Sequence, residues 1–192
     1  MLLWTIQPVE IYQLLQDSGA YRCDPEQISM PEFKTQYDWL ADQMKKRISP
    51  PPEGVKYPVW AWFKWCGKHE KPDLRRMRWE TGADGEKLVC MEIEIADEQV
   101  LLSDYDVWHL VLGNWFISET EDESDQIERY LDGLKPEEAY NFKSKNWERV
   151  FDITPLSNEW TIRGKFVQAC FWELRKEQDL NVRQFTAKSR KY

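Results

Sequence analysis

The sequence has few of the residues and patterns that mark metal, redox or membrane proteins. Its 192 residues include only two histidines and four cysteines, and no two cysteines form a CxxC pair. Metal-site spacing is therefore absent, and scattered cysteines favour reduced, structural thiols over a disulfide framework. No stretch approaches the roughly 18 apolar residues that a membrane-spanning helix needs. We expect no metal cofactor and no membrane partner.

The chain also lacks a basic leader and an excess of positive charge. The first eight residues have no long apolar core, so they predict no signal peptide, and we expect a cytoplasmic protein. Asp and Glu number 34 against 26 Lys and Arg, giving a formal charge of -8. Because nucleic-acid binders are usually basic, this charge disfavours a nucleic-acid partner. The acid concentrates between Glu119 and Asp132, which leaves room for a local cationic pocket.

Aromatic residues, by contrast, are abundant, and eleven of them are tryptophan. Trp60 and Trp62 lie in a stretch of β-type composition that begins at Tyr57. Residues two apart on a strand share a face. The two indoles therefore either stack on a ligand ring or fill the core, and the spacing allows both.

A cationic turn follows this aromatic strand. Its members are Lys64, Lys68, Lys71, Arg75, Arg76 and Arg78, with Asp73 among them. Guanidinium groups bind phosphate or carboxylate in a fork geometry, so Lys64, Arg75 and Arg76 are candidate ligand-binding residues. The alternative is an exposed loop whose charge offsets the acidic helices. Asp73 is either a further ligand contact or an internal partner that orients Arg75 or Arg76.

Hydrophobic periodicity predicts strands mixed with helices and no regular βαβ alternation. Strands are expected at 2–7, around the 57–63 stretch, and at 88–95, 166–174 and 182–187. Helices are expected from Pro8 to a closing Gly19, at 31–47, after an N-cap at Ser103, and at 119–132 and 136–152. The pattern predicts a single α+β domain over 1–192. It has a small mixed or antiparallel sheet, surrounding helices and an acidic helical insertion at 119–152.

One acidic residue stands out on a predicted late strand. Glu173 shares its face with Val167, Ala169 and Phe171. A charge among apolar residues must be paired or functional. In a cleft, such a carboxylate can stabilise a cationic transition state.

Several of these stretches resemble the bacterial domain-of-unknown-function family 3841. The resemblance covers nearly the whole chain and rests on 3–7, 37–40, 57–62, 71–75, 100–104 and 167–174. It implies family membership without a known activity.

The order of elements is also similar in architecture to that of ADP-ribosyltransferases, a likeness that implies an NAD cofactor. In that layout a first strand contacts the ribose, at Gln7 or Thr5 here. A middle strand contacts the nicotinamide, at Trp60 or Trp62, and Glu173 stabilises the oxocarbenium-like centre. We expect an NAD- or nucleotide-binding protein of this type. The alternative is a non-catalytic module that binds a protein or peptide target.

Overall fold

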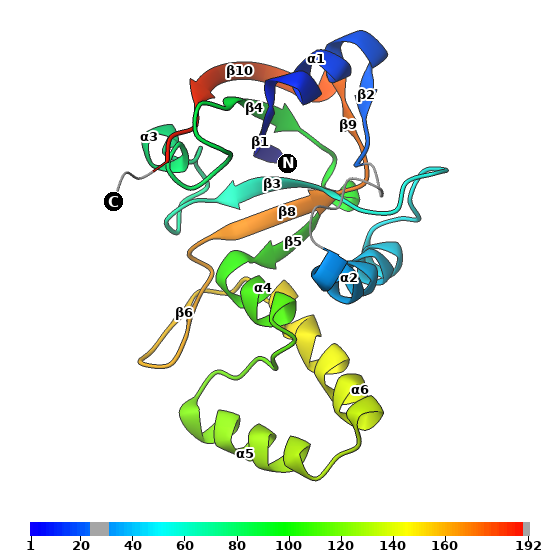
Figure 1. Ribbon diagram of the computed structural model, residues 1–192, viewed down its shortest axis with the longest axis vertical. Coiled ribbons are helices and arrows are strands. Elements are labelled where there is room, and N and C mark those ends of the chain that lie inside the picture. Colours follow the sequence, from blue (N-terminus) through cyan, green and yellow to red (C-terminus); the bar gives the residue numbers. More distant parts are fainter. Residues whose placement is uncertain (24–30, 190–192) are drawn as a thin grey trace.

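The computed structural model describes residues 1–23 and 31–189. Its centre is a six-stranded sheet in the order β10-β4-β1-β3-β8-β5, and every neighbouring pair runs antiparallel (Figure 1). The strands are β1 (Leu2–Pro8), β3 (Val59–Lys64), β4 (Lys87–Glu94), β5 (Leu101–Asp104), β8 (Val167–Phe171) and β10 (Asp179–Thr186). An antiparallel sheet with helices between its strands confirms the predicted α+β class.

Six α-helices and two small two-stranded sheets complete the described fold. The helices are α1 (Val9–Ser18), α2 (Lys34–Arg47), α3 (Leu74–Met77), α4 (Tyr105–Leu112), α5 (Glu121–Asp132) and α6 (Pro136–Asn146). Strands β2 (Ala20–Tyr21) and β9 (Leu174–Arg175), from opposite ends of the chain, form one antiparallel pair, and β6 (Leu156–Ser157) and β7 (Ile162–Arg163) form a hairpin. Four 3-10 turns lie at Pro31–Phe33, Asp97–Gln99, Trp147–Phe151 and Lys176–Gln178. Among residues 1–23 and 31–189, no helix combines the length and apolarity needed to cross a membrane.

Local signals in the sequence explain where most helices begin and end. Helix α1 follows Pro8 and closes at Gly19, whose φ of 81° is left-handed and suits glycine, as predicted. Helix α2 ends with three cations in its last turn. The predicted N-cap at Ser103 is wrong. Ser103 is buried in β5, and the next residue, Asp104, accepts the backbone N–H of Val107 and caps α4.

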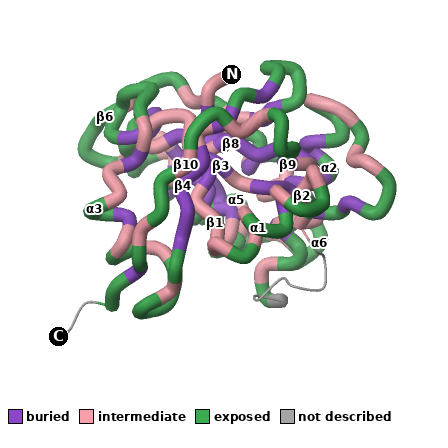
Figure 2. Tube along the Cα trace, turned by 90° about the horizontal axis from the view of Figure 1, so that it is seen from above, coloured by how far each residue is buried: buried purple, intermediate pink, exposed green. Residues whose placement is uncertain are grey.

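The sheet separates two apolar cores. Trp60 pairs with Cys170, which belongs to the core that α2, α4 and the Trp147–Phe151 turn complete. Val59 and Ala61 belong to the second core, which α1 covers through Leu15. Alternate residues of one strand thus serve opposite faces. Figure 2 shows the buried residues concentrated in the central strands.

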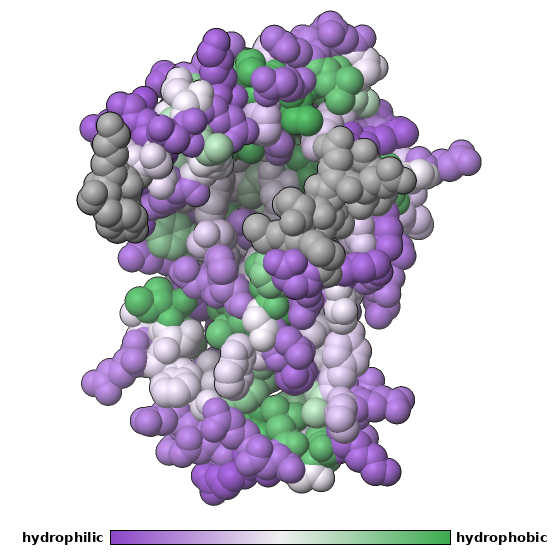
Figure 3. Space-filling model, viewed as in Figure 1, coloured by the Kyte–Doolittle hydropathy of each residue, from purple (hydrophilic) through white to green (hydrophobic). Residues whose placement is uncertain are grey.

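The acidic segment 119–152 forms α5, α6 and the following 3-10 turn. The two helices extend away from the sheet, whereas the turn packs against it through Trp147 and Val150 (Figure 1). Figure 3 shows apolar residues gathered between these two helices. Tyr130 of α5 and Phe142 of α6 contact each other there, with ring centroids 5.2 Å apart. The acidic side chains of α5 lie mainly at exposed positions, so this segment follows the ordinary pattern of an amphipathic helix pair.

Candidate functional site

The two indoles predicted to form one wall have different surroundings. Trp60 packs under the helices, with its ring centroid 5.6 Å from that of Trp108 in α4 and 6.4 Å from that of Tyr37 in α2. Trp62 lies two residues further along β3, and its ring contacts Trp65 and Tyr105 instead. Trp60 is therefore part of the core boundary, and Trp62 lines a cavity.

This cavity, here called the aromatic pocket, has a volume of about 310 Å³. It lies between the end of β3, α3 and the start of α4, and its lining residues are Trp62, Trp65, Arg76, Met77, Glu80, Thr81, Tyr105, Asp106 and Phe166. The Trp62 and Trp65 rings meet at 90° with centroids 4.9 Å apart, and Tyr105 lies 5.0 Å from Trp62. Rings at steep angles make the walls of a box rather than a parallel slot for a flat base.

The cationic turn contributes one guanidinium to the aromatic pocket. Arg76 places its Cζ 5.8 Å from the Trp65 ring centroid and donates from Nε to Glu80 Oε1 at 2.9 Å. Arg75 lies outside the pocket and pairs with Asp73 through both carboxylate oxygens, at 3.0 and 2.9 Å. Asp73 is thus an internal partner that orients Arg75, which was one of the two roles predicted for it. Lys64 Nζ lies 6.0 Å from the Phe63 ring centroid.

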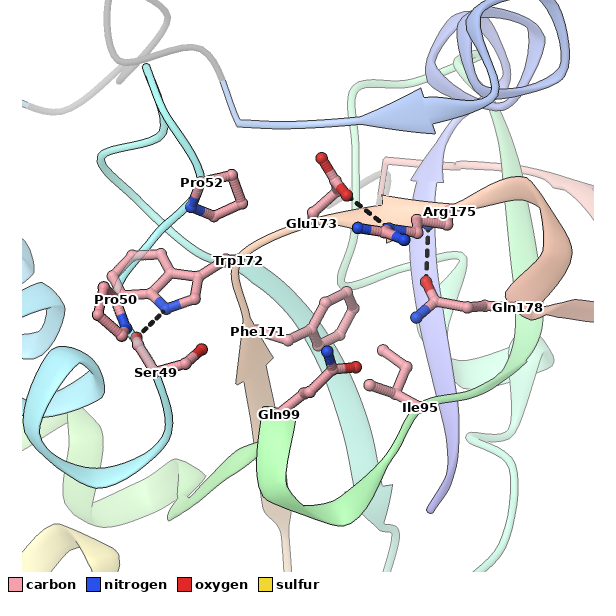
Figure 4. Close-up of a pocket in the computed structure, with 10 residues that line it drawn as sticks. All are labelled: Ser49, Pro50, Pro52, Ile95, Gln99, Phe171, Trp172, Glu173, Arg175 and Gln178. Carbon is pink, nitrogen blue, oxygen red and sulfur yellow. Dashed lines mark hydrogen bonds and ion pairs between the residues drawn. The ribbon is translucent and has the colours of Figure 1, made fainter.

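Glu173 lines a different and smaller cavity of about 100 Å³ (Figure 4). Its carboxylate, 8% exposed, pairs with Arg22 at 2.5 Å and with Arg175 at 2.6 Å. Burial alone would raise the pKa of Glu173, but these two guanidiniums outweigh burial and lower it. The charge is therefore paired within the protein. Gln7 donates to Thr5 Oγ1 at 2.9 Å, on the strand face that packs against α1.

The register of β3 and β8 explains why the predicted site residues do not meet. Val59 pairs with Phe171 at one end, and Lys64 pairs with Val167 at the other. Five residues of strand separate these ends by about 17 Å. Glu173 was predicted to lie on this strand, but β8 ends at Phe171 and Glu173 lies between β8 and β9. The aromatic pocket lies beyond the opposite, Lys64 end. The structure thus brings Trp62 and Arg76 together in one pocket. The other predicted site residues lie outside it: Gln7, Trp60, Lys64, Asp73, Arg75 and Glu173.

A buried carboxylate holds the α4 side of the aromatic pocket in place. Asp104 accepts the backbone N–H of Val107 at 2.9 Å and that of Gly164 at 2.6 Å. It therefore joins the start of α4, which carries Tyr105 and Asp106, to the turn before Phe166. Burial raises the pKa of Asp104, and its backbone donors act against that rise.

Two further hollows, here called the Trp160 hollows, continue in series from the aromatic pocket. The first, about 480 Å³, shares Asp106 with it and is also lined by Leu110, Trp160 and Ile162. The second, about 460 Å³, shares Trp160 and Glu159 with the first and is lined by Glu119, Thr120 and Glu121. The Trp160 indole donates to Ser118 Oγ at 3.0 Å, which fixes the turn between β6 and β7 against the segment before α5.

Sequence reasoning missed most of the residues around these three hollows. Trp65 lies in the aromatic stretch that was singled out, but Tyr105, Phe166 and Trp160 come from distant segments. The one available signal was Tyr105-Asp106, an aromatic and an acid at a predicted helix start. The described residues hold no group of three or more His, Cys, Asp or Glu placed to bind a metal.

Comparison with known proteins identifies the family. The model of the family described as Domain of unknown function (DUF3841) matches residues 2–179. The chain belongs to this family. No curated protein and no solved structure matches it. In this DUF3841 chain, the aromatic pocket and the Trp160 hollows form the candidate site.

Proposed function

We propose that this chain is a non-catalytic binding domain that takes an extended basic segment of a partner protein into the aromatic pocket and the Trp160 hollows. The supporting observation is that three adjoining cavities, linked by shared lining residues, combine exposed aromatic surface with unpaired acid. Aromatic and apolar side chains that remain accessible in clefts are typical of recognition sites.

The charge of the lining favours a basic ligand. Among the described lining residues of the three cavities, Arg76 is the only Lys or Arg, and Glu80 pairs with it. No described cation forms a salt bridge with Asp106, Glu121 or Glu159. A positively charged segment would complement these three carboxylates, whereas a phosphate group would be repelled by them.

The NAD-dependent, ADP-ribosyltransferase-like activity stays a prediction, as does the cytoplasmic location. In that prediction Trp60 and Trp62 contact the ring, and Arg75 and Arg76 hold phosphate. Gln7 contacts the ribose, and Glu173 stabilises the oxocarbenium-like centre. The paired state of Glu173 and its place in a separate cavity are not what such a reaction requires. Binding of NAD is accordingly included as a competing outcome of the same experiment.

The experiment is a calorimetric titration of the whole chain with three probes. They are an eight-residue peptide of alternating arginine and serine, its glutamate-serine counterpart, and NAD. We expect only the basic peptide to bind, and more weakly as salt rises, because screening weakens exposed charge pairs. Absence of peptide binding would refute the proposal, and NAD binding that Glu173→Gln weakens would favour the enzyme.

Two tryptophan variants locate the binding site. Trp160→Ala removes the ring shared by two hollows and should weaken binding of the basic peptide by about fivefold or more. Trp115→Ala is the matched control, because Trp115 is 57% exposed but does not line any of the three hollows. Equal affinities of the two variants for the peptide would place binding elsewhere and contradict the proposed site.

A further inference from the structure

The aromatic pocket already contains one example of how it contacts a cation. The guanidinium of Arg76 lies over the Trp65 ring at 5.8 Å, while Glu80 accepts its Nε–H at 2.9 Å. One aromatic ring and one carboxylate together thus hold one guanidinium. Arginine favours this arrangement because its planar, weakly hydrated head stacks on rings and pairs with acids.

A second combination of aromatic rings and a carboxylate lies in the same pocket, without a described cation between them. Trp62 and Tyr105 present rings 5.0 Å apart and inclined at 52°, and Asp106 follows Tyr105 at the start of α4. Asp106 is exposed, and no described cation forms a salt bridge with it. The Arg76–Glu80 pair is electrically balanced, so the carboxylate of Asp106 leaves the lining of the aromatic pocket with a net negative charge.

We infer that the aromatic pocket takes the guanidinium of a partner arginine, paired with Asp106 and stacked against Trp62 and Tyr105. This inference rests on the proposed function and names the side chain that the pocket selects. Lysine is a poorer fit, because its ammonium is strongly hydrated and has no planar face to lay on a ring. Leu110, Trp160 and Ile162 in the adjoining hollow would then contact the neighbouring residues of the same segment.

The test compares three peptides of one length and spacing. The arginine-serine peptide is titrated beside versions in which every arginine is replaced by lysine, with equal charge, or by citrulline, with equal shape and no charge. We expect arginine to bind about fivefold or more tighter than lysine, and citrulline to bind weakest. If lysine and arginine bind equally, the proposed function stands and the arginine inference fails. If none of the peptides binds, both fail.

Three variants of the protein complete the test. Asp106→Asn keeps the shape of the side chain and should weaken binding of the arginine peptide about fivefold. Asp17→Asn, at an exposed position of helix α1, is the matched charge control. Arg76→Ala should bind the arginine peptide more tightly, because the change removes a guanidinium from the pocket and frees Glu80 and the Trp65 ring. Binding that is not tighter in Arg76→Ala, or unchanged binding by Asp106→Asn with its fold intact by circular dichroism, would overturn the inference.

Discussion

Replacing Asp104 by alanine should destabilise the protein far more than an ordinary helix-cap substitution. Its side chain is fully buried and accepts two backbone N–H groups, from Val107 and Gly164. Loss of the cap costs about 0.5–2 kcal/mol. The buried N–H of Gly164 is left without its acceptor, which costs about 1–3 kcal/mol more. We therefore expect Asp104→Ala to lower the free energy of unfolding by about 1.5–5 kcal/mol.

The assay is denaturant unfolding followed by tryptophan fluorescence, with Thr120→Ala as the matched control. Thr120 caps α5 through a single exposed bond from Glu123 N at 3.1 Å, so its loss should cost about 1 kcal/mol. Asp104→Asn should lose an amount of unfolding free energy between those of Asp104→Ala and Thr120→Ala, because the amide keeps one acceptor oxygen. If Asp104→Ala loses no more free energy than Thr120→Ala, the second, buried bond contributes nothing and the reasoning is refuted.

The same carboxyl group makes stability depend on pH. Burial raises the pKa of Asp104 above its ordinary value of 3.8. The folded state then keeps a proton that the unfolded chain has lost, so this group's contribution to stability falls as pH rises from about 3.8 through the raised pKa. Subtracting the unfolding free energy of Asp104→Asn from that of the wild type at each pH isolates the pH dependence that Asp104 contributes. A difference that is constant from pH 3 to 7 would contradict it.

Three further substitutions have defined outcomes. Gly164→Ala should lower the unfolding free energy by at least about 2 kcal/mol, because φ is +77° and a Cβ would lie 2.8–2.9 Å from backbone atoms of 153–155. Gly133→Ala is the control and should lower it little, because a Cβ there would have no contact under 3.7 Å. Trp147→Ala removes a fully buried indole and should lower the unfolding free energy by about 3–5 kcal/mol. Glu173→Gln should reduce the loss of stability below pH 4.5, because the native pKa of Glu173 is lowered and its contribution disappears as pH falls.

Each of these outcomes has a contrary result. Equal unfolding free energies of the two glycine variants would mean that the turn at Gly164 relaxes freely. A loss below about 1 kcal/mol in Trp147→Ala would mean that the core collapses into the space. An acid slope in Glu173→Gln as steep as in the wild type would mean that its two ion pairs do not stabilise the folded state.

Local patterns predicted the elements well because the signals that make them are local. The alternation of Leu2 to Gln7 and the glycine after α1 depend only on neighbouring residues, and both are confirmed. Local signals could not decide which residue caps α4, because Ser103 and Asp104 are both good capping residues. Pairing of β5 with β8 decided between them by placing Ser103 inside the sheet.

Composition and periodicity by themselves determined the α+β class, most helices and strands, and the need of Glu173 for a partner. Only the tertiary structure decided which residues share a cavity. Strand register put Glu173 and Arg76 at opposite ends of β3 and β8, and the path of the chain brought Tyr105, Phe166 and Trp160 to the hollows. The physical reason is that periodicity records which side of an element is buried, whereas the partner across a sheet or turn depends on long-range pairing.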